Sequence, residues 1–379
     1  MAFIPKTWVD DQIVYAEDMN RIEKGIAETD ALLREKSNPN LLDNWYFADP
    51  IDQRGGYVIP PGVVAGEIFT ANNPITTDKY YAVKRFEGSA PVFDYNGVEY
   101  TTDANTAVRG YTGAGYGIDR WNQYVGTTLL AENGIVLISP TITDPNWKDI
   151  NQFLSDDLIM ALRGKEVTIS CLVDVDTLVG GLDYVTLSNN TKSYFDATDV
   201  YETGLQIIQR TFTVPNTWEK TDQVRFTFGM YVTEGRATLI AAKLELGSQQ
   251  TLAHQDESGN WVLNDLPNKA LELAKCQRYY QRFKNPTRTF IGIVNVSGTD
   301  SWVPVHTARM RAIPSVNIHN MNIYDVKTNL QYAVSSASCQ YMHDGYPTLT
   351  VSADEAIPAG SVIMLNTEKN GFFEMIADL

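Results

Sequence analysis

The stretch Val224-Arg225-Phe226-Thr227-Phe228-Gly229-Met230-Tyr231-Val232 carries the clearest structural signal in this 379-residue chain. Every second residue from Val224 to Val232 is apolar, and the residues between them are Arg, Thr, Gly and Tyr. Successive side chains of a β-strand point to opposite faces, so this alternation puts five apolar side chains on one face. The stretch therefore predicts a half-buried β-strand.

The same alternation recurs across the surrounding region, residues 41–247. It is seen in Val167, Ile169, Cys171 and Val173, in Phe212 with Val214, and in Leu244 with Leu246. A helix is expected in this region only near residues 151–162. Repeated half-buried strands bounded by turn residues indicate a β-sandwich. The fold class is therefore mainly β.

A connecting helix and a second β-region are expected after this sandwich. Asp265-Leu266-Pro267 supplies a capping residue and a first-turn proline, and an apolar face then extends as far as Phe283. Asn285-Pro286 ends the helix. Short strands follow, which predict a small C-terminal β-sandwich; they are expected at residues 291–293, 302–305, 316–318, 348–351 and 362–365.

The N-terminal segment contains a short heptad pattern formed by Met19, Ile22, Ile26 and Leu33. A helix this short is marginal in water, so oligomerisation must stabilise it. Isoleucine at both Ile22 and Ile26 favours three or four strands over two. The alternative is an ordinary amphipathic helix packed on its own domain. The polar breaker Ser37-Asn38-Pro39-Asn40 ends the helix.

The composition argues against several kinds of partner. The chain has 46 Asp and Glu against 30 Lys and Arg, a formal net charge of −16. This charge disfavours nucleic acid and anionic membranes. Lys6, Asp10 and Asp11 interrupt any apolar signal-peptide core, and no stretch approaches a membrane span. We therefore expect a soluble protein made in a cytoplasm, without membrane insertion.

Common catalytic and metal-binding motifs are not found in the sequence. The three cysteines are scattered singly, and the four histidines lack the spacing of metal ligands. Asp174 and Asp176 could form the carboxylate pair of a glycoside hydrolase. Alternatively, they are simply neighbours on one face of a strand. We expect no enzyme, no catalytic residues and no metal site.

A binding role fits the aromatic content better, with 20 Tyr, 14 Phe and 7 Trp. Sugar rings have apolar faces and hydroxyl edges, so their sites combine flat aromatics with polar side chains. Segments with this mixture give five candidate carbohydrate contacts: Trp147, Tyr184, Tyr194, Tyr201 and Tyr346. For each, packing in the core or at its rim is the alternative. Trp121 is assigned to the core, with Arg120 paired to a carboxylate.

Several segments resemble tail proteins of phages and prophages of Gram-positive bacteria. Residues 7–10 (TWVD) and 16–23 (AEDMNRIE) resemble their N-terminal attachment segment. Four segments resemble the carbohydrate-binding-module-like jelly-roll domain of phage tail fibres: residues 40–47 (NLLDNWYF), 52–56 (DQRGG), 109–121 and 243–248 (KLELGS). Residues 274–280 (AKCQRYY), 310–314 (MRAIP) and the final ADL are similar to the C-terminal domain of these fibres.

The resemblance implies a homotrimeric fibre located in the virion tail. Residues 1–38 would form an attachment arm and trimeric coiled-coil helix that contacts tail or baseplate proteins. Residues 39–250 would form the jelly-roll domain, 251–285 a linker hairpin and helix, and 286–379 the C-terminal β-sandwich domain. Residues 57–108 are a longer insertion, expected to add strands.

Three functions follow from these observations. The first is attachment of a virion to a host surface glycan, with several weak sites strengthened by trimeric avidity. The negative charge favours a neutral glycan or one bound with help from a divalent cation; no other cofactor is expected. The alternatives are a structural tail or baseplate component without a glycan site, and a wall-polysaccharide depolymerase.

Overall fold

A computed structural model describes most of the chain after the N-terminal segment. The described residues are 38–53, 57–58, 83–87, 90–95, 98–101, 109–112, 115–123, 127–131, 133–139, 143–180, 182–189, 193–194, 203–284, 287–295, 300–305 and 308–377. The predicted arm and coiled coil, with Met19, Ile22, Ile26 and Leu33, lie outside them. Within these ranges strands dominate and two α-helices occur, so the mainly β prediction is confirmed.

Two sheets form the first sandwich. Its larger sheet has ten strands: β14 (Gly204–Thr213), β11 (Glu166–Val179), β16 (Glu234–Leu246), β9 (Gly134–Ser139), β8 (Thr127–Ala131), β2 (Val83–Glu87), β3 (Ala90–Tyr95) and β4 (Val98–Thr101) in order, with β5 (Arg109–Thr112) beside β8 and β1 (Tyr57–Val58) beside β5. The smaller sheet has six strands, in the order β13 (Ser193–Tyr194), β12 (Leu182–Ser188), β15 (Arg225–Val232), β10 (Asn146–Phe153), β7 (Asn122–Gln123) and β6 (Gly115–Tyr116). Strands β2 to β4 arise from the insertion, as expected.

The core lies between these two sheets and follows the alternation in the sequence. The apolar residues of β15, among them Phe226 and Phe228, are completely buried, as is Ile169 from the opposite sheet. Trp121 is also completely buried, and its ring centroid lies 4.9 Å from that of Phe47. Truncating a side chain of this size to alanine typically costs about 3–5 kcal/mol.

The two helices are shorter than predicted. Helix α3 covers Asp156–Leu162, because residues 151–153 belong to β10; the 3-10 helix η1 covers Lys220–Asp222. Helix α4 covers Lys269–Gln277 and is capped by Asn268 rather than Asp265. Tyr280 and Phe283, expected on its face, instead lie in β19 (Tyr280–Lys284), where they pair with β25. Pairing with a neighbouring strand therefore outweighs the helical spacing.

The C-terminal strands form one seven-stranded sheet. Its order is β19, β25 (Val362–Ile376), β20 (Thr287–Val294), β21 (Asp300–Pro304), β24 (Tyr346–Ala353), β23 (Gln331–His343) and β22 (Ser315–Asp325). Strand β25 also pairs with β22, so the sheet closes on itself. It encloses a second buried cluster, separate from the first, which includes Ile323, Ile363 and Phe373.

A hairpin of β17 (Ala253–Gln255) and β18 (Trp261–Leu263) follows the first sandwich. Leu252 and Ala253 are buried in the first core cluster, so the hairpin packs on that sandwich. Next to it, Lys243 and Glu245 form a buried ion pair with 3.6 Å between Nζ and Oε2. Burial lowers the pKa of Lys243, and the charge of Glu245 opposes this effect.

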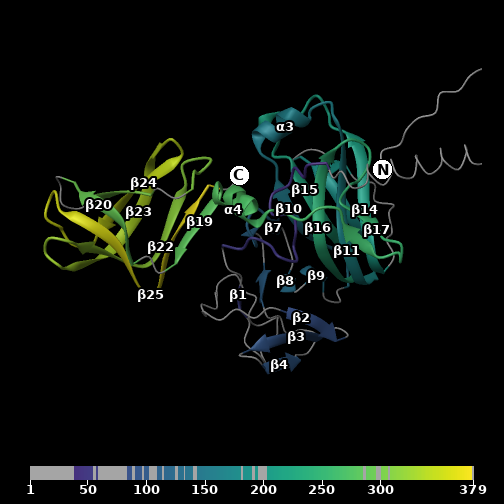
Figure 1. Cartoon of the computed structure of the whole chain (residues 1–379), viewed down its shortest axis with the longest axis horizontal. Coiled ribbons are helices and arrows are strands. Elements are labelled where there is room, and N and C mark those ends of the chain that lie inside the picture. Colours follow the sequence, from purple (N-terminus) through teal and green to yellow (C-terminus); the bar gives the residue numbers. More distant parts are fainter. Residues whose placement is uncertain are drawn as a thin grey trace, which may run out of the picture.

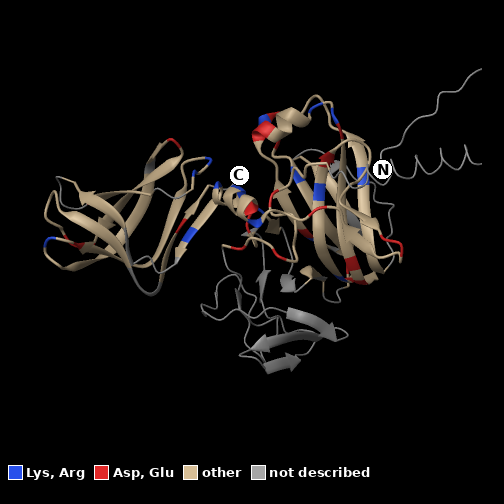
Figure 2. Ribbon diagram, in the orientation of Figure 1, with Lys and Arg blue, Asp and Glu red and all other residues tan. Residues whose placement is uncertain are grey.

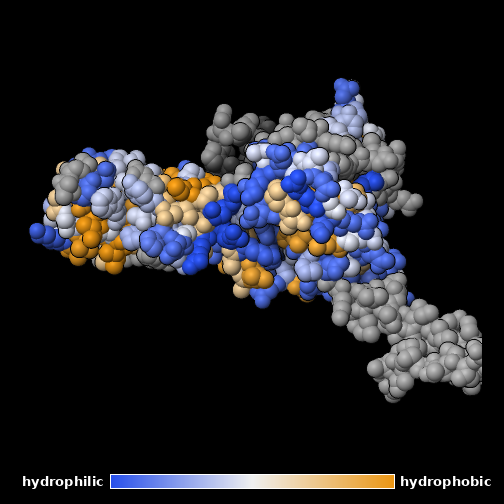
Figure 3. Space-filling model, turned by 90° about the horizontal axis from the view of Figure 1, so that it is seen from above, coloured by the Kyte–Doolittle hydropathy of each residue, from blue (hydrophilic) through white to orange (hydrophobic). Residues whose placement is uncertain are grey.

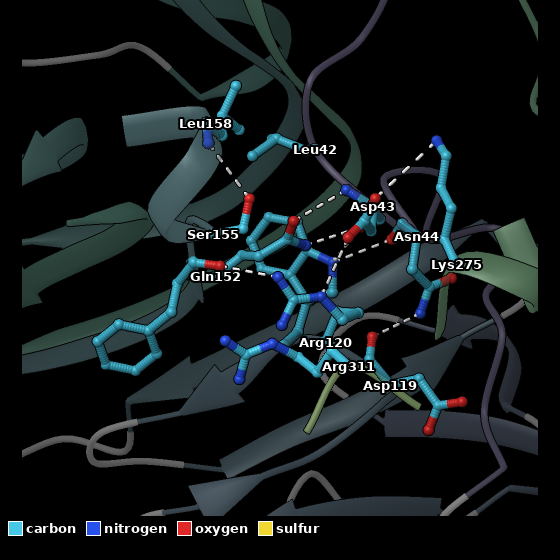
Figure 4. Close-up of polar contacts among 12 residues, drawn as sticks. Leu42, Asp43, Asn44, Asp119, Arg120, Gln152, Ser155, Leu158, Lys275 and Arg311 are labelled. Carbon is cyan, nitrogen blue, oxygen red and sulfur yellow. Dashed lines mark hydrogen bonds and ion pairs between the residues drawn. The ribbon is translucent and has the colours of Figure 1, made fainter. Parts of the chain in front are cut away.

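Helix α4 lies at the joint between the two cores (Figure 1). Charged residues of both signs are found along it (Figure 2). The Arg120 guanidinium lies 3.6 Å from the centre of the Tyr279 ring, and its Nε lies 3.1 Å from Oδ2 of Asp43 (Figure 4). The backbone oxygen of Tyr279 accepts a hydrogen bond from the N–H of Ala377 at 2.6 Å. Arg120 therefore pairs with a carboxylate, as predicted, and also joins the two β-units.

Candidate functional site

The outer face of the six-stranded sheet presents chemically varied side chains in register. Its members lie on the side opposite the core-facing residues of β10, β12 and β15. Cross-strand pairing arranges them in four rows: Leu182, Tyr231 and Trp147; Tyr184, Gly229 and Asp149; Thr186, Thr227, Asn151 and Asn122; and Ser188, Arg225 and Phe153. We call this surface the outer face.

One end of the outer face is aromatic. Trp147 is 39% exposed and lies opposite Tyr231, with ring centroids 4.5 Å apart and ring planes tilted by 39°. In the next row Gly229 lies between Tyr184 and Asp149. A glycine within a strand leaves space where a ligand can approach the backbone. Gly229 is itself buried, so this end exposes mainly the rings of Trp147 and Tyr231.

The centre of the outer face is polar and closely packed. Asn151 and Thr186 expose only 3% and 4% of their surface. Nδ2 of Asn151 donates to Oδ1 of Asp149 at 3.2 Å, but Oδ1 of Asn151 and Oγ1 of Thr186 have no hydrogen-bond partner among the described residues. Leaving a buried polar atom unpaired costs about 1–3 kcal/mol. A ligand hydroxyl or a bound water would remove this cost.

The other end of the outer face carries a cation. Nε of Arg225 lies 3.5 Å from Oγ of Ser188, the outer limit of a hydrogen bond. No carboxylate of the described residues lies within ion-pair distance of Arg225. On the opposite side of β10, burial lowers the pKa of Lys148. The face thus runs from aromatic rings through amide and hydroxyl groups to a guanidinium.

The structure brings only some of the predicted carbohydrate contacts together. Trp147 and Tyr184 occupy neighbouring rows of the outer face. Tyr194 lies in edge strand β13, where its backbone pairs with Leu187, outside the rows of the outer face. Tyr201 lies outside the described residues. Tyr346 belongs to the C-terminal sheet, where the Arg309 guanidinium lies 5.7 Å from the centre of its ring.

Four residues proposed here as part of the site were not predicted from the sequence: Tyr231, Asn151, Thr186 and Arg225. The alternation in residues 224–232 already placed Arg225 and Tyr231 on the polar side of their strand. The missing information was strand order, because β10, β12 and β15 are distant in sequence but adjacent in the sheet.

Two other groups of polar residues lie away from the outer face. A cavity of about 170 Å³ lies beside the joint, where Glu272 accepts hydrogen bonds from the N–H of Asn44 at 2.6 Å and from Nζ of Lys275 at 2.7 Å. Both oxygens of Glu272 thus serve the joint. Of the acidic pair on β11, Asp176 binds Arg236 at 3.2 Å. Burial, together with the charge of Asp176, raises the pKa of Asp174.

The described residues contain no group of three or more potential metal ligands of the His, Cys, Asp or Glu type. Among the helices that the structure describes, none has the length and apolar character needed to cross a bilayer.

Comparisons with known proteins give no family assignment. No protein-family model and no curated protein sequence matches the chain. One solved structure it resembles is the N-terminal CBM22-1-CBM22-2 tandem domain of Xyn10C from Paenibacillus barcinonensis. The match covers 91% of this chain and 99% of that chain, with 11% identity and a TM-score of 0.23. That score is too low to indicate a shared fold.

Proposed function

We propose that the protein binds a glycan on the outer face of its six-stranded sheet. The observation that carries the proposal is that the aromatic row shares one face with Oδ1 of Asn151 and Oγ1 of Thr186, two atoms with no hydrogen-bond partner among the described residues. A sugar ring would stack on Trp147 and Tyr231 through its C–H face. Oδ1 of Asn151 and Oγ1 of Thr186 each expose less than 1 Å², so the groups packed over them would move aside for sugar hydroxyl groups to reach them. Each contact is modest, so affinity would come from several of them together.

The biological setting that fits this activity is host attachment by a phage or prophage tail fibre. The N-terminal and domain-level resemblances support this role, and the short heptad pattern supports a homotrimer. Three linked copies would strengthen weak sugar contacts by about 10² to 10⁴. The first 38 residues would contact tail or baseplate proteins, which places the protein in the virion tail. The role requires neither catalysis nor a cofactor.

A glycan array of the full chain tests the binding proposal. A ligand found on the array is then titrated against Trp147→Ala and Trp302→Ala. Trp302 is 56% exposed on the C-terminal sheet and is the matched control. We expect affinity to fall about tenfold or more for Trp147→Ala, the usual scale for a stacking aromatic, and to be unchanged for Trp302→Ala. Equal effects of the two substitutions would contradict the proposed site.

Light scattering tests the proposed trimer separately. The full chain should have three times the 42.3 kDa mass of one chain. Replacing Ile22 and Ile26 with Asn should abolish the trimer by putting polar groups into the seam. A monomer before substitution would contradict the fibre role while leaving the glycan site open.

A structural role without glycan binding is the second candidate, and one surface feature favours it. Hydrophobic residues gather on the C-terminal domain (Figure 3). Ile293 pairs with Trp302 on one side and Val362 on the other, and all three are at least 45% exposed. Contiguous exposed apolar residues often mark protein contacts. An array with no positive glycan would favour this candidate.

A further inference from the structure

The outer face ends in a cation whose charge no acidic side chain of the described residues balances. Arg120 and Arg236 each lie within 3.2 Å of a carboxylate oxygen. Among the described residues, Arg225 makes one polar side-chain contact, the 3.5 Å approach of its Nε to Oγ of Ser188. Arg163, Arg278, Arg309 and Arg311 likewise have no carboxylate of the described residues within ion-pair distance. What distinguishes Arg225 is its place on the outer face. A guanidinium binds oxyanions well because its planar donors match carboxylate and phosphate oxygens.

We propose that the glycan bound here carries an acidic substituent, a carboxylate or a phosphate, that pairs with Arg225. The inference rests on the proposed function, since it assigns a specificity to the same site. It also qualifies the expectation of a neutral ligand that follows from the net charge. Net charge governs long-range approach, whereas a partly buried guanidinium acts at contact distance.

The distribution of charge along the outer face also gives the ligand a direction. Asp149 lies one row from Trp147 and Tyr231, so the aromatic end would repel an acidic group. Arg225 lies six residues along β15 from Tyr231, roughly 20 Å at about 3.3 Å per residue. Neutral sugar rings would therefore occupy the aromatic end. The acidic substituent would lie a few sugar units away, beside Arg225 and Ser188.

Calorimetric titration of the full chain with matched tetrasaccharides tests this specificity. The probes are neutral tetrasaccharides of glucose, galactose and N-acetylglucosamine. Each is paired with one counterpart carrying a single uronic carboxylate and another carrying a single phosphate monoester. Titrations are done at about 0.15 M salt, where long-range repulsion is largely screened. We expect the affinity for the preferred tetrasaccharide to be about tenfold higher or more when that tetrasaccharide carries the acidic group.

Two variants at Arg225 and one control variant test whether Arg225 causes the preference for the acidic probe. Arg225→Gln should remove the preference, so that the acidic probe binds no more tightly than its neutral counterpart. Arg225→Lys keeps the charge and should retain part of the preference. Arg309→Gln, at an exposed arginine of the C-terminal domain, should leave both affinities unchanged. The carboxylate and phosphate probes show which acid is recognised.

The outcomes separate this inference from the proposed function. Neutral probes that bind in a Trp147-dependent way, with acidic counterparts no better, would overturn the inference alone. A preference for acid that survives Arg225→Gln would also overturn it. Failure of every probe to bind would contradict both the inference and the glycan-binding proposal.

Discussion

Thr186 and Thr168 allow the contribution of a buried hydroxyl to glycan binding to be distinguished from its contribution to stability. Oγ1 of Thr186 is buried with no partner in the part of the chain that the structure describes, whereas Oγ1 of Thr168 lies 2.8 Å from Oγ1 of Thr211 and donates to the Gly247 carbonyl at 2.7 Å. Thr186→Val should leave the free energy of unfolding unchanged or raise it by about 1 kcal/mol, since it removes an unpaired polar atom. It should also weaken glycan binding.

Thr168→Val is the matched control for this prediction. It breaks satisfied hydrogen bonds and should lower the free energy of unfolding by about 1–2 kcal/mol, with glycan affinity unchanged. Urea unfolding and calorimetric titration of both variants provide the comparison. Loss of stability in Thr186→Val without loss of binding would show that its hydroxyl has a structural role.

Asp325, at the end of β22, should make stability depend on pH. Burial raises the pKa of Asp325, but hydrogen bonds from Thr328, Lys327 and Ser361 outweigh burial and hold it below its usual value. The unfolded chain then binds the proton more readily than the folded chain. The stabilisation is therefore complete above about pH 4 and is lost as pH falls through the lowered folded pKa.

Asp325→Asn tests this pH dependence. The difference in free energy of unfolding between wild type and variant should be largest near neutral pH and should shrink below about pH 4. Asp354→Asn, at an exposed carboxylate of the same domain, is the control and should have little effect. A difference for Asp325→Asn that stays constant from about pH 2 to 7 would contradict the assignment.

Among the secondary-structure elements, α4 shows the value of a well-placed cap. The Asn268 side chain accepts hydrogen bonds from the N–H groups of Ala270 and Leu271 at 3.1 and 3.2 Å. Ser155, the cap of α3, accepts one bond, at 3.4 Å. Asn268→Ala should therefore lower the free energy of unfolding by about 1 kcal/mol, and Ser155→Ala by less. Urea unfolding measures both, and the reverse order would contradict the cap assignments.

Sequence periodicity predicted individual elements better than it predicted their ends and partners. The β15 alternation gave its buried and outer faces correctly, because the core needs apolar side chains on one side only. Tyr280 and Phe283 were misplaced on a helix, because pairing with β25 is a tertiary interaction. Strand β23 was missed because its Ser-rich sequence lacks an apolar alternation. Likewise, the outer face could not be predicted without knowing the order of its strands in the sheet.

Across the whole molecule, Tyr279 connects the two β-units. Its ring is contacted by the guanidinium of Arg120 and, at 5.4 Å, by that of Arg311, and it is 5% exposed. Tyr279→Ala should remove about 3–5 kcal/mol of packing and loosen the joint. We expect thermal unfolding to separate into two transitions and small-angle scattering to show a larger radius of gyration.

Tyr341→Ala is the control for the joint, because Tyr341 is 67% exposed in the C-terminal domain. It should leave both measurements unchanged. If Tyr279→Ala still unfolds in the same way as wild type, with an unchanged radius of gyration, the two units are held together by other contacts.

A crystal structure of the full chain with an array-selected oligosaccharide tests the glycan site most directly. The account predicts a sugar ring stacked on Trp147 and Tyr231, with a hydroxyl at hydrogen-bond distance from Oδ1 of Asn151 or Oγ1 of Thr186. A sugar bound beside Tyr346, or anywhere else off the outer face, would contradict it.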